Sequence, residues 1–310
     1  MLAVGLVICA LCLLGAAYAP SFVALLVLLG LAGAAGSSVN SASGRAVMHW
    51  FGAHERGLAL GIRQSAIPVG GLVGALAVPP FAEAGGSEAA FLFLAGLSAA
   101  GALVGAVMLR RRESADGVET ATLARTLADT QLWRVCIGSG LYLYAQIAIL
   151  GFTVIFLHDE HGLSESEAAL VVAVSQVLAI VLRLAAGRWS DIVGSRIGPF
   201  RRVGLACTGS LVLVGVLAGG PVWLLVIALA LGGGLTMAWN GLSFAAAAEL
   251  AGAKRSGAAI GLQQTVLSAS GVVAPVLFVA TVSGSSWTLA FLVAAGFPLV
   301  GWAVLGTLQE

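Results

Sequence analysis

The sequence predicts an all-α polytopic membrane protein that crosses the bilayer ten times, and three observations support this fold class. The chain has 310 residues, of which 59% are hydrophobic and only 9% are charged, whereas about a quarter of the residues of a typical soluble protein are charged. Long apolar runs follow one another along the chain, and its second part repeats a pattern found in the first. A soluble fold is excluded, because so few charged residues could not cover its surface.

Ten apolar runs are long enough to form membrane-spanning helices, each of which needs about 20 residues to cross the hydrocarbon core. Prolines, glycines and polar residues interrupt the apolar pattern and mark the predicted loops. In chain order, the predicted spans and the interruptions that end them are 2–18 (Pro20-Ser21), 22–46 (His49 to Arg56), 58–82 (Glu83 to Glu88), 89–109 (Arg110 to Thr130), 132–157 (His158 to Ser164), 166–187 (Arg188 to Arg202), 203–219 (Gly219 to Pro221), 221–247 (Leu250 to Ser256), 258–282 (Ser283 to Ser286) and 287–307.

Basic residues occur in alternate interruptions, which sets the predicted orientation, because Lys and Arg concentrate in cytoplasmic loops. The interruptions between them contain neither Lys nor Arg. We therefore expect both chain ends on the cytoplasmic side of a plasma membrane, and the abundance of Arg, Ala and Gly favours a bacterial source. The basic groups are Arg56; Arg110, Arg111, Arg112 and Arg125; Arg188, Arg196, Arg201 and Arg202; and Lys254 and Arg255.

The chain matches itself at an offset of 200 residues, which indicates related helices in its two parts. Between residues 25 and 73, 15 of 49 positions are identical to the residue 200 positions later, whereas about a tenth would match by chance in this composition. Polar matches such as Asn40 with Asn240 and Gln64 with Gln264 are the hardest to attribute to composition. Both copies follow loops predicted to be cytoplasmic, so the repeat is parallel.

The repeat and the one long interruption predict three regions. Residues 1–110 form an incomplete N-terminal bundle of four spans, 111–130 a cytoplasmic linker and 131–310 a six-helix C-terminal bundle. At the offset of 200, Met1 aligns with Arg201, so the first 70 residues of the C-terminal bundle, 131–200, have no counterpart. We therefore expect a matching segment with two further spans to precede Met1 in a complete protein.

Two motifs carry a family resemblance. The segment from Arg183 to Gly194, RLAAGRWSDIVG, contains a G-x-x-x-D-x-x-G pattern, and the segment from Gly57 to Gly71 is rich in glycine and contains Pro68. They resemble the signature loop and the fifth span of the major facilitator superfamily, although Ile192 replaces a basic residue usual in that loop. The resemblance implies two bundles related by an axis along the membrane normal. It also implies secondary transport of a small solute by alternating access, with or without a coupling ion.

Arg63 is the most informative candidate for the solute cavity, because a charged residue inside a span usually faces a bundle interior or an aqueous cavity. It would contact an anionic solute or act as a gating cation. The alternative is an arginine whose charged end extends to the cytoplasmic surface or pairs with a group in the absent helices. Its repeat partner is Gln263, so we expect polar side chains at the same level in both bundles.

Other polar residues on the predicted spans complete this candidate cavity. Asn40 and Asn240 lie on spans that resemble the family's cavity-lining fourth and tenth, and Tyr142 and Gln146 share one helical face. Hydrogen bonding between closely packed helices is the alternative role. The cavity candidates are Asn40, Arg63, Gln64, Tyr142, Gln146, Trp239, Asn240, Gln263 and Gln264.

Charges and glycines at the cytoplasmic ends of the spans form a second candidate group. The resemblance implies that such charges hold helix ends together in one state and release them in another, whereas ordinary solvated loops are the alternative. We expect Asp191 to act with Arg183 and Arg188, and Glu249 with the basic residues that follow it. The gate candidates are Arg183, Gly187, Asp191, Gly194, Glu249 and Arg255.

Several other function classes lack support. The sequence has no G-x-x-x-x-G-K-[ST] loop for ATP and no catalytic set at membrane depth, so we predict neither an enzyme nor a cofactor. With a net charge of +1, no basic region for nucleic acid is present. The run from His158 to His161 has metal-ligand residue types but lies in an exterior loop, so no metal site is predicted. The alternative to a transporter is a truncated, non-transporting membrane fragment or scaffold.

Overall fold

The computed structural model describes residues 2–108 and 120–308, and all regular structure in these ranges is helical. The predicted linker segment 111–119 lies outside the described residues. The helices are α1 (Leu2–Ala17), α2 (Phe22–Trp50), α3 (Arg56–Met108), α4 (Thr120–Leu127), α5 (Thr130–Leu150), α6 (Thr153–His161), α7 (Glu165–Val193), α8 (Ile197–Leu217), α9 (Val222–Thr236), α10 (Asn240–Gly284) and α11 (Trp287–Leu305).

Two of these helices consist of two arms each. The backbone of α3 leaves the helical conformation at Gly85 and Gly86, and that of α10 does so at Gly252. Gly86 has φ 67° and Gly252 has φ 75°, a left-handed conformation that glycine adopts without strain. Both breaks fall in interruptions that the sequence predicts. Within the described residues, eight helices are long and apolar enough to cross a membrane, and the total of ten spans stays a prediction.

Short polar residues begin several helices by accepting a backbone N–H that has no partner within the helix. At the start of α7, Ser164 and Glu167 form a reciprocal capping box. Glycines in the left-handed conformation follow α6 and α7. The side-chain oxygens of Ser21, Asp129 and Ser286 cap α2, α5 and α11 in the same way.

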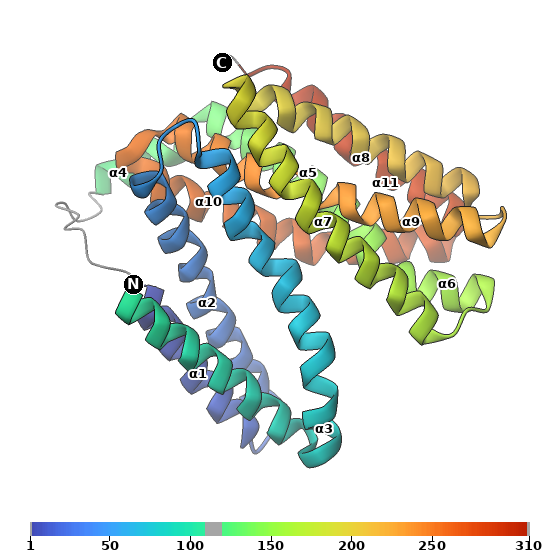
Figure 1. Cartoon of the computed structure of the whole chain (residues 1–310), viewed down its shortest axis with the longest axis horizontal. Helices are drawn as coiled ribbons and strands as arrows, with labels where there is room; N and C mark the ends of the chain where they lie inside the picture. The colour runs from blue at the N-terminus through green and yellow to red at the C-terminus, as the bar shows by residue number, and fades with distance from the viewer. Residues whose placement is uncertain (1, 109–119, 309–310) are drawn as a thin grey trace.

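The helices form two bundles that meet at one end and diverge toward the other (Figure 1). In the N-terminal bundle, α1 packs against α2 and α3, and in the C-terminal bundle, α5 and α8 pack against α11. The bundles meet where α3 packs on α7 and α2 packs on α10. Met48 of α2 is 5% exposed and belongs to a core cluster whose other buried members come from residues 132–305. Burial of Met48 at this end therefore involves the C-terminal bundle, and we expect separation of the bundles to expose it.

The basic loops gather at the closed end, which makes the predicted orientation testable. The loop before α3 contacts Arg196, and Arg255 pairs with Asp129. In a variant without native cysteines, a cysteine at Lys254 should react with an impermeant maleimide only from the cytoplasm, because this end carries the basic residues. Cysteines at Glu88 and His158 should react from outside. The reverse pattern would contradict both the orientation and the parallel repeat.

Candidate functional site

Three glycines let α3 and α7 cross with their backbones in contact. A Cβ atom at Gly57 would lie 2.5 Å from the carbonyl oxygen of Gly187, and one at Gly61 would lie 3.0 Å from the carbonyl oxygen of Arg183. Such distances leave no room for a side chain without moving the backbone. The two bundles therefore meet main chain to main chain, and this contact fixes the position of the residues beside it.

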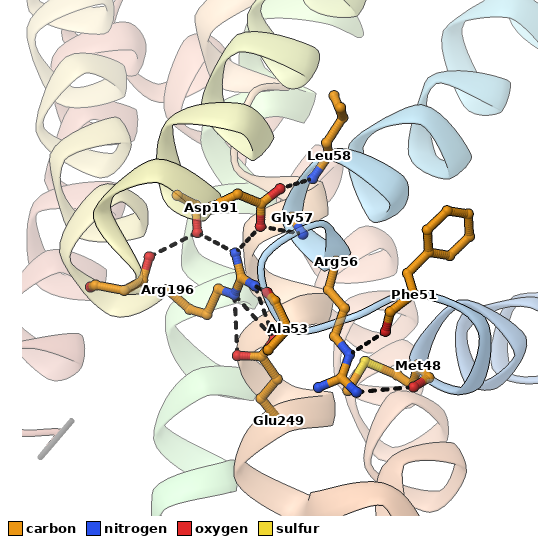
Figure 2. A network of polar contacts seen from close by, with 11 residues as sticks. Met48, Phe51, Ala53, Arg56, Gly57, Leu58, Asp191, Arg196 and Glu249 are labelled. Atoms are coloured by element: carbon orange, nitrogen blue, oxygen red, sulfur yellow. Dashed lines mark hydrogen bonds and ion pairs between the residues drawn. The ribbon is translucent and has the colours of Figure 1, made fainter.

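The Asp191 side chain, near the end of α7, binds the first turn of α3 in the other bundle (Figure 2). Oδ1 accepts the backbone N–H of Gly57 at 2.9 Å, and Oδ2 accepts that of Leu58 at 2.8 Å. These N–H groups have no partner within their own helix, and the helix dipole favours a negative charge there. Since the Asp191 side chain is fully buried, α7 caps α3 from across the bundle interface.

Arg196, in the turn before α8, extends this contact to two further segments (Figure 2). Its guanidinium pairs with Asp191 at 2.6 Å and with Glu249 of α10 at 3.1 Å, and it donates a hydrogen bond to the carbonyl of Ala53. Burial opposes the charge on Arg196, but hydrogen bonds and attraction from Glu249 and Asp191 outweigh it and hold the Arg196 pKa above its ordinary value. We call Asp191, Arg196 and Glu249 the closure cluster.

The structure brings some predicted gate residues together and separates others. Gly187 lies at the crossing of α3 and α7, and Gly194 ends α7 with φ 68°. Arg255 does not pair with Glu249 but with Asp129, at 3.3 Å. Arg183 is buried between the bundles, away from Asp191, and is considered below. Arg188 is exposed, and within the described residues no ion pair joins it to Asp191.

Arg196 is the functional candidate that the sequence analysis missed. The sequence pattern places it only among the basic residues that set the predicted orientation. Its position five residues after Asp191, in a signature loop whose usual basic residue is replaced by Ile192, was the available signal. The basic residue of this loop is therefore Arg196 instead of the residue directly after Asp191, and it still pairs with Asp191.

A polar cluster joins the two bundles at the level of Arg63. The Arg63 guanidinium donates to Oδ1 of Asn40 at 2.7 Å and to its backbone carbonyl, and its Nε donates to Ser43 Oγ at 2.8 Å. The side-chain amide of Asn40 donates to Gln264 Oε1 of α10 at 3.1 Å. Arg63 also donates to Gln64 Oε1 at 3.3 Å. We call these five residues the bridging cluster.

Residues related by the repeat make matching contacts within the C-terminal bundle. Gln263 Nε2 donates to Ser243 Oγ at 2.9 Å, the same connection across 20 residues that Arg63 makes in the first copy. Ser243 donates to the carbonyl of Asn240 at 3.0 Å, and the Asn240 amide donates to Gln146 Oε1 at 3.1 Å. The repeat at an offset of 200 is therefore present in the hydrogen bonds as well as in the sequence.

Tyr142 and Trp239 lie inside the core of the C-terminal bundle, and both are fully buried. Their ring centroids are 6.1 Å apart, and Tyr142 also meets the ring of Phe200 edge-on at 5.0 Å. Gln146, one turn from Tyr142, is only half-buried. Contact of these residues with a solute stays a prediction.

In the part of the chain that the structure describes, the guanidinium of Arg63 contacts neutral groups. Among the described residues no carboxylate forms an ion pair with it, and the ring of Phe244 lies 5.5 Å from the guanidinium carbon. No group of three His, Cys, Asp or Glu side chains suited to a metal ion occurs in the same ranges. Within the described residues the bridging cluster thus contains one cation without a carboxylate partner, together with amide and hydroxyl groups that hydrogen-bond it or one another.

Comparison with known families places this arrangement in one of them. The family model of the Major Facilitator Superfamily matches residues 1–152 and 135–308. The chain belongs to the Major Facilitator Superfamily. Two uncharacterized MFS-type transporters of Mycobacterium tuberculosis are each 34% identical to it over 305 residues, covering 96% of this chain and 68% of their own sequences. The protein is thus a membrane transporter of this superfamily and not an enzyme.

Solved structures of MFS transporters share the fold. The E. coli fucose:proton symporter superposes with a TM-score of 0.79 at 15% identity, over 100% of this chain and 83% of the symporter. A second structure of that transporter, in the outward conformation, gives 0.78 at 17% identity, over 100% and 82%. The human organic anion transporter gives 0.76 at 17% identity, over 97% and 76%. At these identities the similarity establishes the fold alone.

Asp191→Asn should loosen the closed end of the transporter. The amide carries no charge and can no longer accept hydrogen bonds through both of its ends, and charge-assisted hydrogen bonds contribute about 1.5–3 kcal/mol. In a cysteine-free background with Met48→Cys as reporter, maleimide labelling should become about tenfold faster. Asp159→Asn, at an exposed position of α6, is the matched control and should change nothing. Equal rates in both variants would show that the closure cluster does not hold this end together.

Proposed function

We propose that this protein is a secondary transporter that carries a small anionic solute across a bacterial plasma membrane by alternating access. The observation that carries the proposal is the bridging cluster, where an arginine without a carboxylate partner among the described residues is connected to both bundles. A solute changes a conformational equilibrium only if it binds two arrangements with different affinity. A site shared by two bundles meets this requirement, because its geometry changes when the bundles move.

The charge of Arg63 favours an anion over a neutral solute. A guanidinium presents five donors in a planar fork that matches carboxylate or phosphate oxygens. A bound anion would also neutralise a charge that is costly inside a membrane span. The amides of Asn40 and Gln264 would hydrogen-bond the remainder of the solute. The superfamily fold accommodates this class, since the human protein with the same fold is an organic anion transporter.

We infer that the bundles are in the outward-facing arrangement. They meet at the end that holds the closure cluster and the basic loops, and they diverge toward the opposite end (Figure 1). Because basic residues mark cytoplasmic loops, the closed end would face the cytoplasm, together with both chain termini. One structure of the fucose transporter with this fold is in the outward conformation.

The described part of the bridging cluster gives no carboxylate for a coupling proton. Its titratable member is Arg63, and its other members are amides and a hydroxyl. Proton relays in membranes usually use Asp, Glu or His. An acidic solute that carries its own proton is one arrangement that needs no such residue. A coupling ion is therefore not assigned to any side chain of this cluster.

Arg63→Gln should abolish anion binding while leaving the protein folded. Ligands stabilise the folded state in proportion to RT ln(1 + [L]/Kd), so a bound anion should raise the unfolding temperature of protein in nanodiscs. The protein is tested with a panel of carboxylates and phosphate, each compared with a neutral amide or alcohol analogue. The unfolding temperature should rise with one class of anion only. Arg63→Gln should lose this rise, and Arg63→Lys should weaken binding by about tenfold, because an ammonium lacks the planar fork.

Arg134→Gln is the matched control, because Arg134 is exposed on α5. It should keep the response of the unmodified protein. Exchange of the radiolabelled anion across proteoliposomes then separates a transporter from a non-transporting scaffold. Stabilisation by neutral analogues to the same extent, or an unchanged response in Arg63→Gln, would contradict the assignment of an anion to this site.

A further inference from the structure

Pro68 leaves one backbone carbonyl of α3 without its usual partner. In an α-helix the carbonyl of residue 64 accepts the N–H of residue 68, and proline has no N–H. Pro68 is buried, so bulk water does not replace the missing donor. At membrane depth an unpaired carbonyl is costly unless a neighbouring helix supplies a donor.

Arg183 of α7 supplies that donor from the other bundle. Its Nη1 donates to the carbonyl of Gln64, and its Nε donates to the carbonyl of Met237 at 2.7 Å, where the chain leaves α9. The Arg183 side chain is only 1% exposed, and no ion pair involves it within the described ranges. One buried guanidinium thus satisfies a carbonyl from each bundle.

The second copy of the repeat shows what is special about Gln64. The residue 200 positions after Pro68 is Ser268, so the carbonyl of Gln264 has a donor within its own helix. Of the two repeat-related carbonyls, only that of Gln64 depends on another helix. The Gln64 side chain also accepts from Arg63 at 3.3 Å. The same residue therefore connects Arg183 to the bridging cluster.

We propose that Arg183 is a positioning residue that holds α3 against α7 in the closed arrangement, by donating to the carbonyl that Pro68 frees. When the two helices separate, water can hydrate both the guanidinium and the carbonyl. The direct bond therefore stabilises the closed arrangement relative to the open one. The inference rests on the proposed alternating-access function in one respect only, namely that separation of the two bundles is a step of transport.

The test measures separation of the bundles and not transport. The full chain with Met48→Cys is placed in nanodiscs, and the rate of maleimide labelling is recorded. Met48 is suited to this purpose because its cover comes from the C-terminal bundle. The native cysteines to be replaced beforehand are Cys9, Cys12, Cys136 and Cys207.

Arg183→Gln should raise the labelling rate about five- to tenfold, because the closed arrangement loses a charge-assisted bond and keeps a buried, unpaired carbonyl. Adding Pro68→Ala should lower the rate again by about threefold or more, because alanine restores the N–H that the Gln64 carbonyl lacks. Such suppression is specific to the proposed bond, since a second packing defect would raise the rate further. The labelling rate of Arg183→Lys should lie between those of the unmodified protein and Arg183→Gln, because an ammonium lacks the planar donor geometry that reaches both carbonyls.

Two matched variants control for general damage. Arg188→Gln changes an exposed arginine of α7 and should not raise the rate, and Pro80→Ala changes an exposed proline of α3 and should not suppress Arg183→Gln. If Arg183→Gln does not fold, the Arg183→Lys series carries the same comparison. An unchanged rate in Arg183→Gln, or a rise that Pro68→Ala does not reverse, would overturn the proposal. Suppression without any anion transport would instead reject the proposed function and retain this inference.

Discussion

The main-chain contact between α3 and α7 is the condition for most other interactions between the bundles. Asp191 reaches the first N–H groups of α3 because Gly57 and Gly187 let the two backbones touch. Arg183 reaches the carbonyl of Gln64 because α3 and α7 are still close one turn further on, where a Cβ atom at Gly61 would lie 3.0 Å from the carbonyl oxygen of Arg183. Hydrogen bonds weaken steeply as their geometry departs from the ideal, so a methyl group at either glycine would affect both contacts. The close approach of the two backbones is thus required before these hydrogen bonds and ion pairs can form.

The sequence predicts the fold, and it indicates some of the contacts in the candidate site but not others, for a physical reason. The repeat indicates Asn40 and Gln264, and the charge inside a predicted span indicates Arg63. The side chains of these three residues contact one another directly or through one intermediate. The partners of Asp191 and Arg183 were not predicted, because these side chains bind backbone N–H and carbonyl groups. Every residue has such groups, and only helix crossing and helix breaks decide which of them are available. Residue types alone therefore cannot identify these contacts.

The two copies of the repeat share a scaffold and differ in chemistry. Ser43 and Ser243 hold equivalent places, but the residue that donates to them is Arg63 in one copy and Gln263 in the other. At this position of the repeat the N-terminal bundle has a charged side chain, and the C-terminal bundle has a neutral amide. The hydrogen bond from the serine to the asparagine carbonyl is the same in both copies. The asparagine amides differ, because that of Asn40 donates to Gln264 of the other bundle and that of Asn240 donates to Gln146 of its own bundle. Equivalent positions of the repeat therefore make contacts between the bundles in one copy and contacts within a bundle in the other.

The first arm of α3 gives the N-terminal bundle the mechanics of a lever. The arm runs from the crossing at Gly57 to the turn at Gly85, a length of about 40 Å at 1.5 Å per residue. A rotation of about 10° about the crossing would move the far end of the arm by about 7 Å, yet it would move the backbone at Arg63 by only about 1.5 Å. A displacement of the second size is enough to make or break a hydrogen bond. Because the polar residues lie near the crossing of α3 and α7, a small displacement at these residues accompanies a wide opening at the distant end.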